Sequence, residues 1–131
     1  MAWTFHNLNN GGTKLINATS GTPDTIVTNA ASTDTLITGI ILHNTHTVAI
    51  IVTLCHVEDS DGEVGSVTIG AASCNVTEFW QQSIAASDTV FLSVKNGDAL
   101  PILEDTNDTL QAYAGTADKV NIFVYGCKKV T

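Results

Sequence analysis

The stretch that decides the fold is residues 35–57, TLITGIILHNTHTVAIIVTLCHV. Two runs rich in β-branched and aliphatic residues flank the polar segment 44–47, which predicts two paired antiparallel strands joined by a short turn. Successive side chains of a strand point to opposite faces, and both faces of these runs are apolar. We therefore expect this hairpin to form the centre of a β-sandwich, with each side covered. Gly39, inside the first run, predicts a bulge or a close backbone approach.

The rest of the chain alternates short strands with turns. Strands are predicted over residues 24–29, 66–69, 73–84, 88–95, 109–114 and 119–127. Val90, Leu92 and Val94 are expected to face inward, and Pro101 places its segment at a sheet edge or outside the ladder. No stretch has a sustained helical period. We predict an all-β fold, an antiparallel β-sandwich of the jelly-roll or immunoglobulin-like kind, with a barrel as the alternative.

An extended N-terminal arm is predicted over residues 1–23, before a sandwich domain of residues 24–131. The arm is polar and rich in turn residues, yet its apolar side chains are too many for a free tail. We expect it to order by lying on a neighbour, in the same or another molecule; the alternative is a first edge strand at residues 13–17. The interface candidates are Trp3, Phe5, Leu8, Leu15 and Ile16 in this arm, and His43 and His46 at the central turn.

The charge balance argues against two classes of partner. The chain has five lysines, no arginine and 13 acidic residues, a net charge of −8. Phosphate recognition needs cations, so we predict no nucleic-acid partner, and no apolar stretch is long enough for a membrane helix. Only 14% of the residues are charged, against about 25% in typical domains. This composition fits a surface buried against protein, and equally an ordinary threonine-rich β protein.

Reactive groupings are sparse in the sequence. There is no Gly-x-Ser-x-Gly, phosphate-binding glycine loop or dinucleotide fingerprint, and Cys55 and His56 are adjacent, so they point to opposite faces. The three cysteines have no metal spacing and are expected to be buried free thiols. His43 and His46 supply too few zinc ligands unless symmetry copies meet on an axis. We predict no enzyme activity, no cofactor and no metal.

Residues 22–126 resemble a set of small phage virion proteins and virion-associated domains. The matching stretches are TPDTIV at 22–27, IILHNT at 40–45, VTL at 52–54, LPIL at 100–103, DTLQA at 108–112 and VNIFV at 120–124. The chain departs from the pattern at residues 105–108, where relatives tend to carry a glycine turn, and in the added arm.

The resemblance implies a virion structural protein made in the host cytoplasm. For a chain of this length it implies a capsid decoration (cement) protein. Such a protein is expected to associate with itself as a homotrimer and to bind the major capsid protein. Removing residues 1–20 is then expected to abolish shell binding and leave the sandwich folded. The alternative is a tail-associated module that binds host surface glycans through exposed aromatic rings such as Trp80. A sandwich of this size is expected to use most such rings in its core or interfaces.

Overall fold

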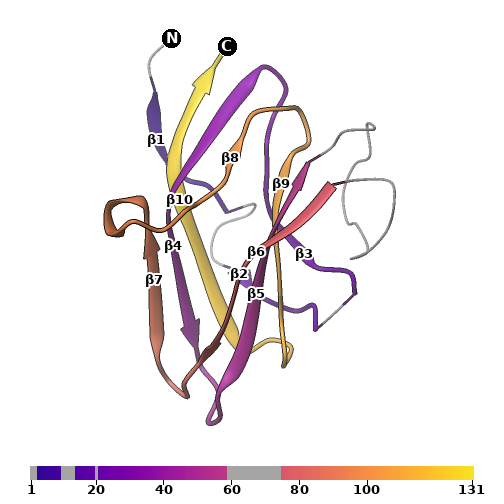
Figure 1. Cartoon of the computed structure of the whole chain (residues 1–131), viewed down its shortest axis with the longest axis vertical. Coiled ribbons are helices and arrows are strands. Elements are labelled where there is room, and N and C mark those ends of the chain that lie inside the picture. Colours follow the sequence, from indigo (N-terminus) through magenta and orange to yellow (C-terminus); the bar gives the residue numbers. More distant parts are fainter. Residues whose placement is uncertain (1–2, 10–13, 20, 59–74) are drawn as a thin grey trace.

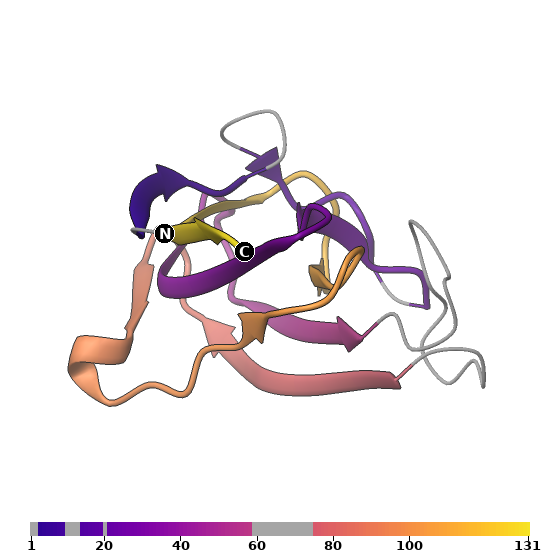
Figure 2. The same ribbon diagram turned by 90° about the horizontal axis from the view of Figure 1, so that it is seen from above.

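The computed structural model describes residues 3–9, 14–19, 21–58 and 75–131. In these residues the chain forms two antiparallel sheets that pack against each other as two layers (Figure 1 and Figure 2). The helical content of the described part is one short 3-10 turn, η1 (Val94–Asn96). The predicted antiparallel β-sandwich is confirmed. The acidic turn at 59–63, the predicted strand at 66–69 and Cys74 lie outside the described residues.

The first sheet contains six strands and the second contains four. The first sheet has the order β1 (Thr4–Asn7), β10 (Val120–Val130), β4 (Thr33–Asn44) and β7 (Thr89–Ser93), with β2 (Lys14–Leu15) also paired to β10 and β8 (Ile102–Leu103) also paired to β4. The second sheet has the order β3 (Asp24–Thr28), β9 (Thr109–Ala114), β5 (Ile50–Glu58) and β6 (Asn75–Ile84).

The two runs of the fold-deciding stretch lie in different sheets, so the prediction that they pair as a hairpin is wrong. β4 pairs with β10, β7 and β8, whereas β5 pairs with β6 and β9. The reason lies at Asn44, whose side-chain amide donates to the carbonyls of Val48 and Ile84, 3.0 Å from each. These bonds turn the chain from one sheet to the other. Each run is nevertheless central in its sheet, as predicted.

The core lies between the sheets and follows the two-residue period of the strands. Val120, Ile122 and Val124 of β10 point inward and are buried, as their spacing predicts. Ile37, Ile40 and Leu42 of the neighbouring strand β4 join them, and the residues that face them from the second sheet include Val52, Leu54, Leu110, Ala112 and Ala114. The prediction that Val94 faces inward is wrong, because the 3-10 turn after β7 leaves its side chain 46% exposed.

The N-terminal segment lies on its own sandwich in the described residues. β1 and β2 both pair with β10 along the edge opposite β4. Between them, the buried Asn9 side chain donates to the carbonyl of Ile122 and accepts from the backbone N–H of Val124, replacing a strand pairing. The start of β1 and the end of β10 therefore lie side by side at one end of the first sheet (Figure 1). The division at residue 23 stays a prediction.

Candidate interaction surface

The outer side of the first sheet carries a row of large apolar side chains. Phe123 of β10 lies opposite Ile41 of β4, which lies opposite Phe91 of β7. Directly paired residues in antiparallel strands share a face, and the neighbours Ile122 and Val124 fill the core. The row therefore points away from the second sheet. Phe123 is 37% exposed and Phe91 46%.

Tyr125 joins this row to the edge strand β1. Its ring centroid is 6.1 Å from that of Phe5 and 6.2 Å from that of Phe91, so the three rings span the sheet from β1 to β7. Beneath the Tyr125 ring lies Gly39, where an added Cβ would stand 2.6 Å from the tyrosine oxygen. The register of β4 and β10 also shifts next to this position. The bulge predicted at Gly39 is confirmed, whereas the group that approaches Gly39 closely is the Tyr125 side chain and not a backbone.

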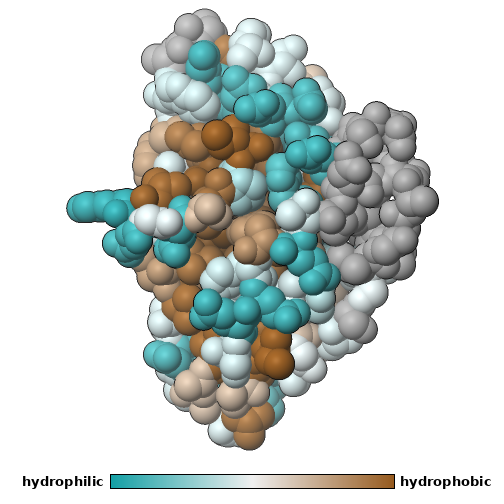
Figure 3. All heavy atoms as spheres, viewed as in Figure 1, coloured by the Kyte–Doolittle hydropathy of each residue, from teal (hydrophilic) through white to brown (hydrophobic). Residues whose placement is uncertain are grey.

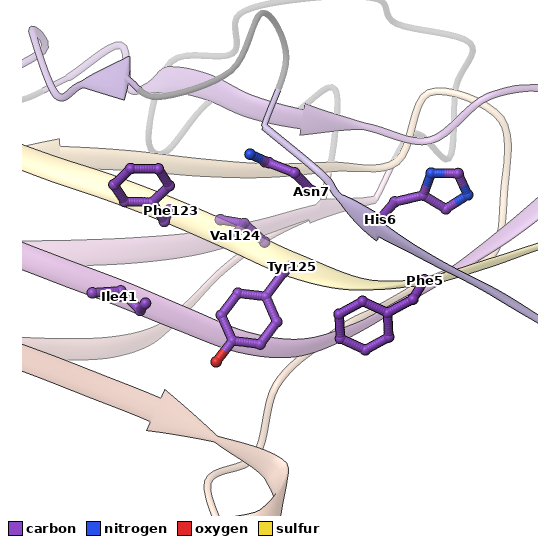
Figure 4. A pocket seen from close by; sticks show the side chains of 7 residues that line it. All are labelled: Phe5, His6, Asn7, Ile41, Phe123, Val124 and Tyr125. Carbon is purple, nitrogen blue, oxygen red and sulfur yellow. The ribbon is translucent and has the colours of Figure 1, made fainter.

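A shallow cavity of about 400 Å³ lies among these rings. In Figure 4 the Tyr125 side chain lies between Phe5 and Ile41, with Phe123 further along β10. The polar lining groups are His6 and Asn7, both on β1. We call the surface formed by Phe5, Ile41, Phe91, Phe123 and Tyr125 the aromatic face.

Exposed apolar residues are concentrated on this side of the molecule. Ten large hydrophobic residues in the described part of the chain are exposed, and only Val48 and Ile51 lie outside the first sheet and the segments that adjoin it. Figure 3 shows that hydrophobic side chains also reach the surface over β8 and the segment between β7 and β8. Contiguous exposed apolar surface of this kind typically marks a protein or ligand contact.

The lysines of this acidic chain lie in or next to the strands of the first sheet. Lys14, Lys128 and Lys129 lie in strands of the first sheet, Lys95 lies in η1 directly after β7, and Lys119 directly precedes β10. The first-sheet strands contain one acid, Asp34, whereas the described strands of the second sheet contain Asp24, Glu58 and Glu78 and no lysine. The Lys129 ammonium stands 5.7 Å from the Trp3 ring centroid, a cation–π contact. The segments next to the first-sheet strands also carry acids: Asp88 directly precedes β7, Glu104 directly follows β8, and Asp118 lies beside Lys119.

Comparisons with known proteins give one distant similarity. No family model matches the chain, and no curated protein matches it significantly. A solved structure, a pentameric capsid protein isolated from metagenomic phage sequences, aligns at 16% sequence identity with a TM-score of 0.24. The alignment covers 91% of this chain, which spans 62% of the length of that protein. Similarity at this level is too distant to assign a function.

The predicted interface residues fall into three groups. Trp3 and Phe5 are exposed at the β1 edge of the aromatic face, and Leu15 is exposed in β2. Leu8 and Ile16 are 3% and 0% exposed and lie in the core of the same chain, which matches ordering of the arm on its own molecule. The reason is the backbone bonds Leu8 N–H to Val124 O and Ile16 N–H to Val120 O, which hold both residues on β10.

The two predicted histidines make separate contacts. His43 Nδ1 lies 2.8 Å from Thr89 Oγ1 on the outer side of the first sheet, while the backbone N–H of His46 donates to Asn44 Oδ1. Neither belongs to a group of three or more metal-ligating side chains in the described part of the chain. Within the same residues, no helix has the length and hydropathy needed to cross a membrane.

Sequence reasoning missed most of the aromatic face. Phe91, Phe123 and Tyr125 were expected mainly in the core or an interface, yet Phe79 and Trp80 are the aromatic residues that pack against the core. The available signal was the second apolar row of the last strand, Phe123 and Tyr125, which alternates with the core row. An apolar row on the outer side of a strand is expected both for a face that other protein covers and for an exposed face, so this pattern alone does not predict which of the two forms.

Cys55 predicts a pH dependence of stability. Its side chain is fully buried on β5, and burial, reinforced by the Glu78 carboxylate, raises the pKa of its thiol from 9.0 to about 12. Above pH 9 the Cys55 thiol ionises in the unfolded chain but stays protonated in the folded protein. Its contribution to the free energy of unfolding is therefore complete below pH 9 and is lost as pH rises toward 12. The loss is at most about 1.4 kcal/mol per pH unit.

The measurement is the free energy of unfolding in urea between pH 8 and pH 11 for wild type and Cys55→Ala. At pH 8 the substitution lowers stability because it leaves a cavity, and as pH rises the variant should lose less stability than wild type. Cys127→Ala, at a half-buried thiol on the other sheet, is the matched control and should keep the wild-type slope. Parallel pH profiles for wild type and Cys55→Ala would contradict the prediction.

Proposed function

We propose that the protein is a structural component of a bacteriophage virion, a capsid decoration protein that binds the outer capsid as a homotrimer and stabilises it. The observation that carries this proposal is the aromatic face, an open apolar surface built on regular strands. Such a surface suits protein contact. The sequence resemblance of residues 22–126 to phage virion proteins supplies the context, and we propose no enzymatic role.

The physical basis of the stabilising role is mass action. A protein that binds the assembled shell and not its dissociated subunits shifts the equilibrium toward the shell. A trimer attaches at several points, so modest affinities at single sites combine into strong attachment. The rigid sandwich favours this role because little ordering is required when its strands make contact.

The test uses purified shells of the parent phage that lack this protein. Added protein should sediment with the shells, saturate at a fixed number of copies and raise the temperature at which the shells break. Sedimentation velocity of the free protein should give the mass of a trimer. Protein that stays in the supernatant while the shells keep their original disruption temperature would refute the proposal.

Deleting residues 1–20 is not a clean test of the arm. The deletion removes Leu8 and Ile16 from the core and Asn9 from its bonds to β10, so the sandwich itself is expected to lose stability. Substitutions at exposed positions such as Phe5, which is 68% exposed, separate attachment from folding.

A glycan-binding role is the second candidate, and the shallow cavity is the observation that favours it. Its rings can stack on sugars, and the Asn7 side chain, which shares the face of Tyr125, can form hydrogen bonds to hydroxyl groups. Trp80 is half-buried against the core, so the exposed rings of the aromatic face are better candidates than Trp80. A glycan array distinguishes the two roles: specific binding by wild type that Phe123→Ala abolishes would favour the tail-associated module.

A further inference from the structure

We infer that a shell protein attaches by adding an extended segment of its chain to the first sheet, as a new strand beside β1. The inference rests on the proposed function and names the edge that attaches and the form of its partner. Strand β1 is an edge of the first sheet, and Figure 2 shows it at the margin of the molecule. Two observations carry the inference: the direction of the β1 backbone groups and the closure of the other sheet edges.

The backbone of β1 directs its polar groups alternately to two sides. The N–H of Leu8 donates to the backbone of β10, so Thr4 and His6 also direct their N–H and C=O groups toward β10. Phe5 and Asn7 direct theirs the opposite way. In the described part of the chain β1 pairs with β10 alone, so the backbone groups of Phe5 and Asn7 form an open hydrogen-bonding edge.

The opposite edge of the first sheet is closed by the molecule's own carboxylates. Strand β7 pairs with β4 so that Thr89, Phe91 and Ser93 direct their N–H groups away from the sheet. The Asp88 carboxylate accepts from the N–H of Thr89 at 2.9 Å. The Asp98 carboxylate accepts from the N–H of Ser93, also at 2.9 Å. A strand added at β7 would have to displace both carboxylates.

The edges of the second sheet resist a further strand in other ways. On β6 the register with β5 shifts, and the strand carries the charged Glu78. On β3 the register with β9 shifts, and the Asp24 carboxylate accepts from the N–H groups of Asn17 and Ala18. Bulges, charges and covering segments are the devices by which proteins prevent strand addition. Strand β1, although only four residues long, has no register shift, no proline and no charged side chain.

The side chains of β1 specify the kind of strand that can be added. All four are exposed, and Phe5 is 68% exposed. Phe5 pairs with Cys127 on the outer side of the sheet, where its ring centroid lies 6.1 Å from that of Tyr125. In an added strand, the residue opposite Phe5 would share this side and cover the ring. Backbone bonds supply the affinity of strand addition, and the side chain opposite Phe5 supplies selectivity for an uncharged, apolar segment.

A second copy of the chain fits this edge less well. Two β1 strands would pair about a two-fold axis and give a dimer, which does not build the proposed homotrimer. The other edges of a second copy are β7, β6 and β3, and each is blocked by carboxylates, a bulge or a covering segment. An extended segment of the shell protein has neither restriction.

The test compares proline with alanine at two positions, by co-sedimentation with parent-phage shells. Proline removes a backbone N–H, and where that N–H points away from the sheet the pairing with the neighbouring strand is kept. Phe5→Pro should therefore bind shells about tenfold or more weakly than Phe5→Ala, while both unfold at similar urea concentrations. Phe91→Pro and Phe91→Ala are the matched pair on β7 and should bind equally. In wild type, amide hydrogen exchange at Phe5 and Asn7 should slow when shells are bound.

The outcomes separate the inference from the proposed function. If wild type binds the shells while Phe5→Pro and Phe5→Ala bind equally, the inference fails and the proposed function stands. If Phe5→Pro does not fold, unchanged exchange at Phe5 and Asn7 in bound wild type overturns the inference in the same way. A weaker binding of Phe91→Pro than of Phe91→Ala would place the contact at β7 and also overturn it. So would dissociation of Phe5→Pro into smaller assemblies in sedimentation velocity, because a second copy would then occupy the edge. If wild type does not bind the shells, both fail.

Discussion

Replacing Gly126 by alanine is expected to destabilise the protein by about 3 kcal/mol or more, a large part of the roughly 5 to 15 kcal/mol that stabilises an ordinary domain. Gly126 lies on β10 where its register with β4 shifts, and its inner side faces the backbone of β4. An added Cβ would overlap the carbonyl oxygen of Leu36 and stand 3.0 Å from its carbonyl carbon and 3.1 Å from Ile37 Cα. All three are backbone atoms, so no rotation of a side chain can relieve the overlap.

Urea unfolding followed by circular dichroism measures this effect. The matched control is Gly115→Ala, where the nearest atoms to an added Cβ are the backbone oxygen and nitrogen of Ile51 at 3.8 and 3.9 Å, ordinary contact distances. Gly115→Ala should unfold within about 0.5 kcal/mol of wild type. An unchanged unfolding midpoint for Gly126→Ala would mean that β4 and β10 do not approach each other as the structure describes.

Replacing Asn44 by alanine is expected to cost about 3 to 4 kcal/mol of unfolding free energy. The side chain is fully buried where β4 ends, and its amide donates to the carbonyls of Val48 and Ile84 while its oxygen accepts from the N–H of His46. The substitution removes these bonds, leaves the buried carbonyl of Ile84 without this partner, and also leaves a cavity. Because Val48 and Ile84 lie on the side of the second sheet, the loss weakens the link between the sheets.

The comparison for Asn44→Ala is Asn96→Ala, at an exposed asparagine in η1. That variant should stay within about 0.5 kcal/mol of wild type in the same urea titration. Amide hydrogen exchange adds a local readout: protection at the turn after β4 should fall most in Asn44→Ala. Equal stability of the two variants would refute the structural role of Asn44.

Much of the local structure follows from short sequence patterns. The alternation of Val120, Ile122 and Val124 predicts which side of β10 is buried, and Gly97, at a φ of 88°, occupies the left-handed position that the Asn96-Gly97 pair predicts. Pro101 precedes a two-residue strand at the edge of the first sheet, as its missing N–H requires. These features depend on neighbours a few residues away, so the sequence order is sufficient to predict them.

The sequence by itself determined the all-β class, the strands and turns above and the inner row of β10, because strand period and turn chemistry are local properties. Only the tertiary structure decided that β4 and β5 belong to different sheets, that Leu8 and Ile16 lie in the core, and that the rings of Phe91, Phe123 and Tyr125 form one open face. Each of these features depends on the pairing of strands that are far apart in the sequence. That choice is made by packing and by buried polar groups such as Asn9 and Asn44, whose partners lie on other strands or turns.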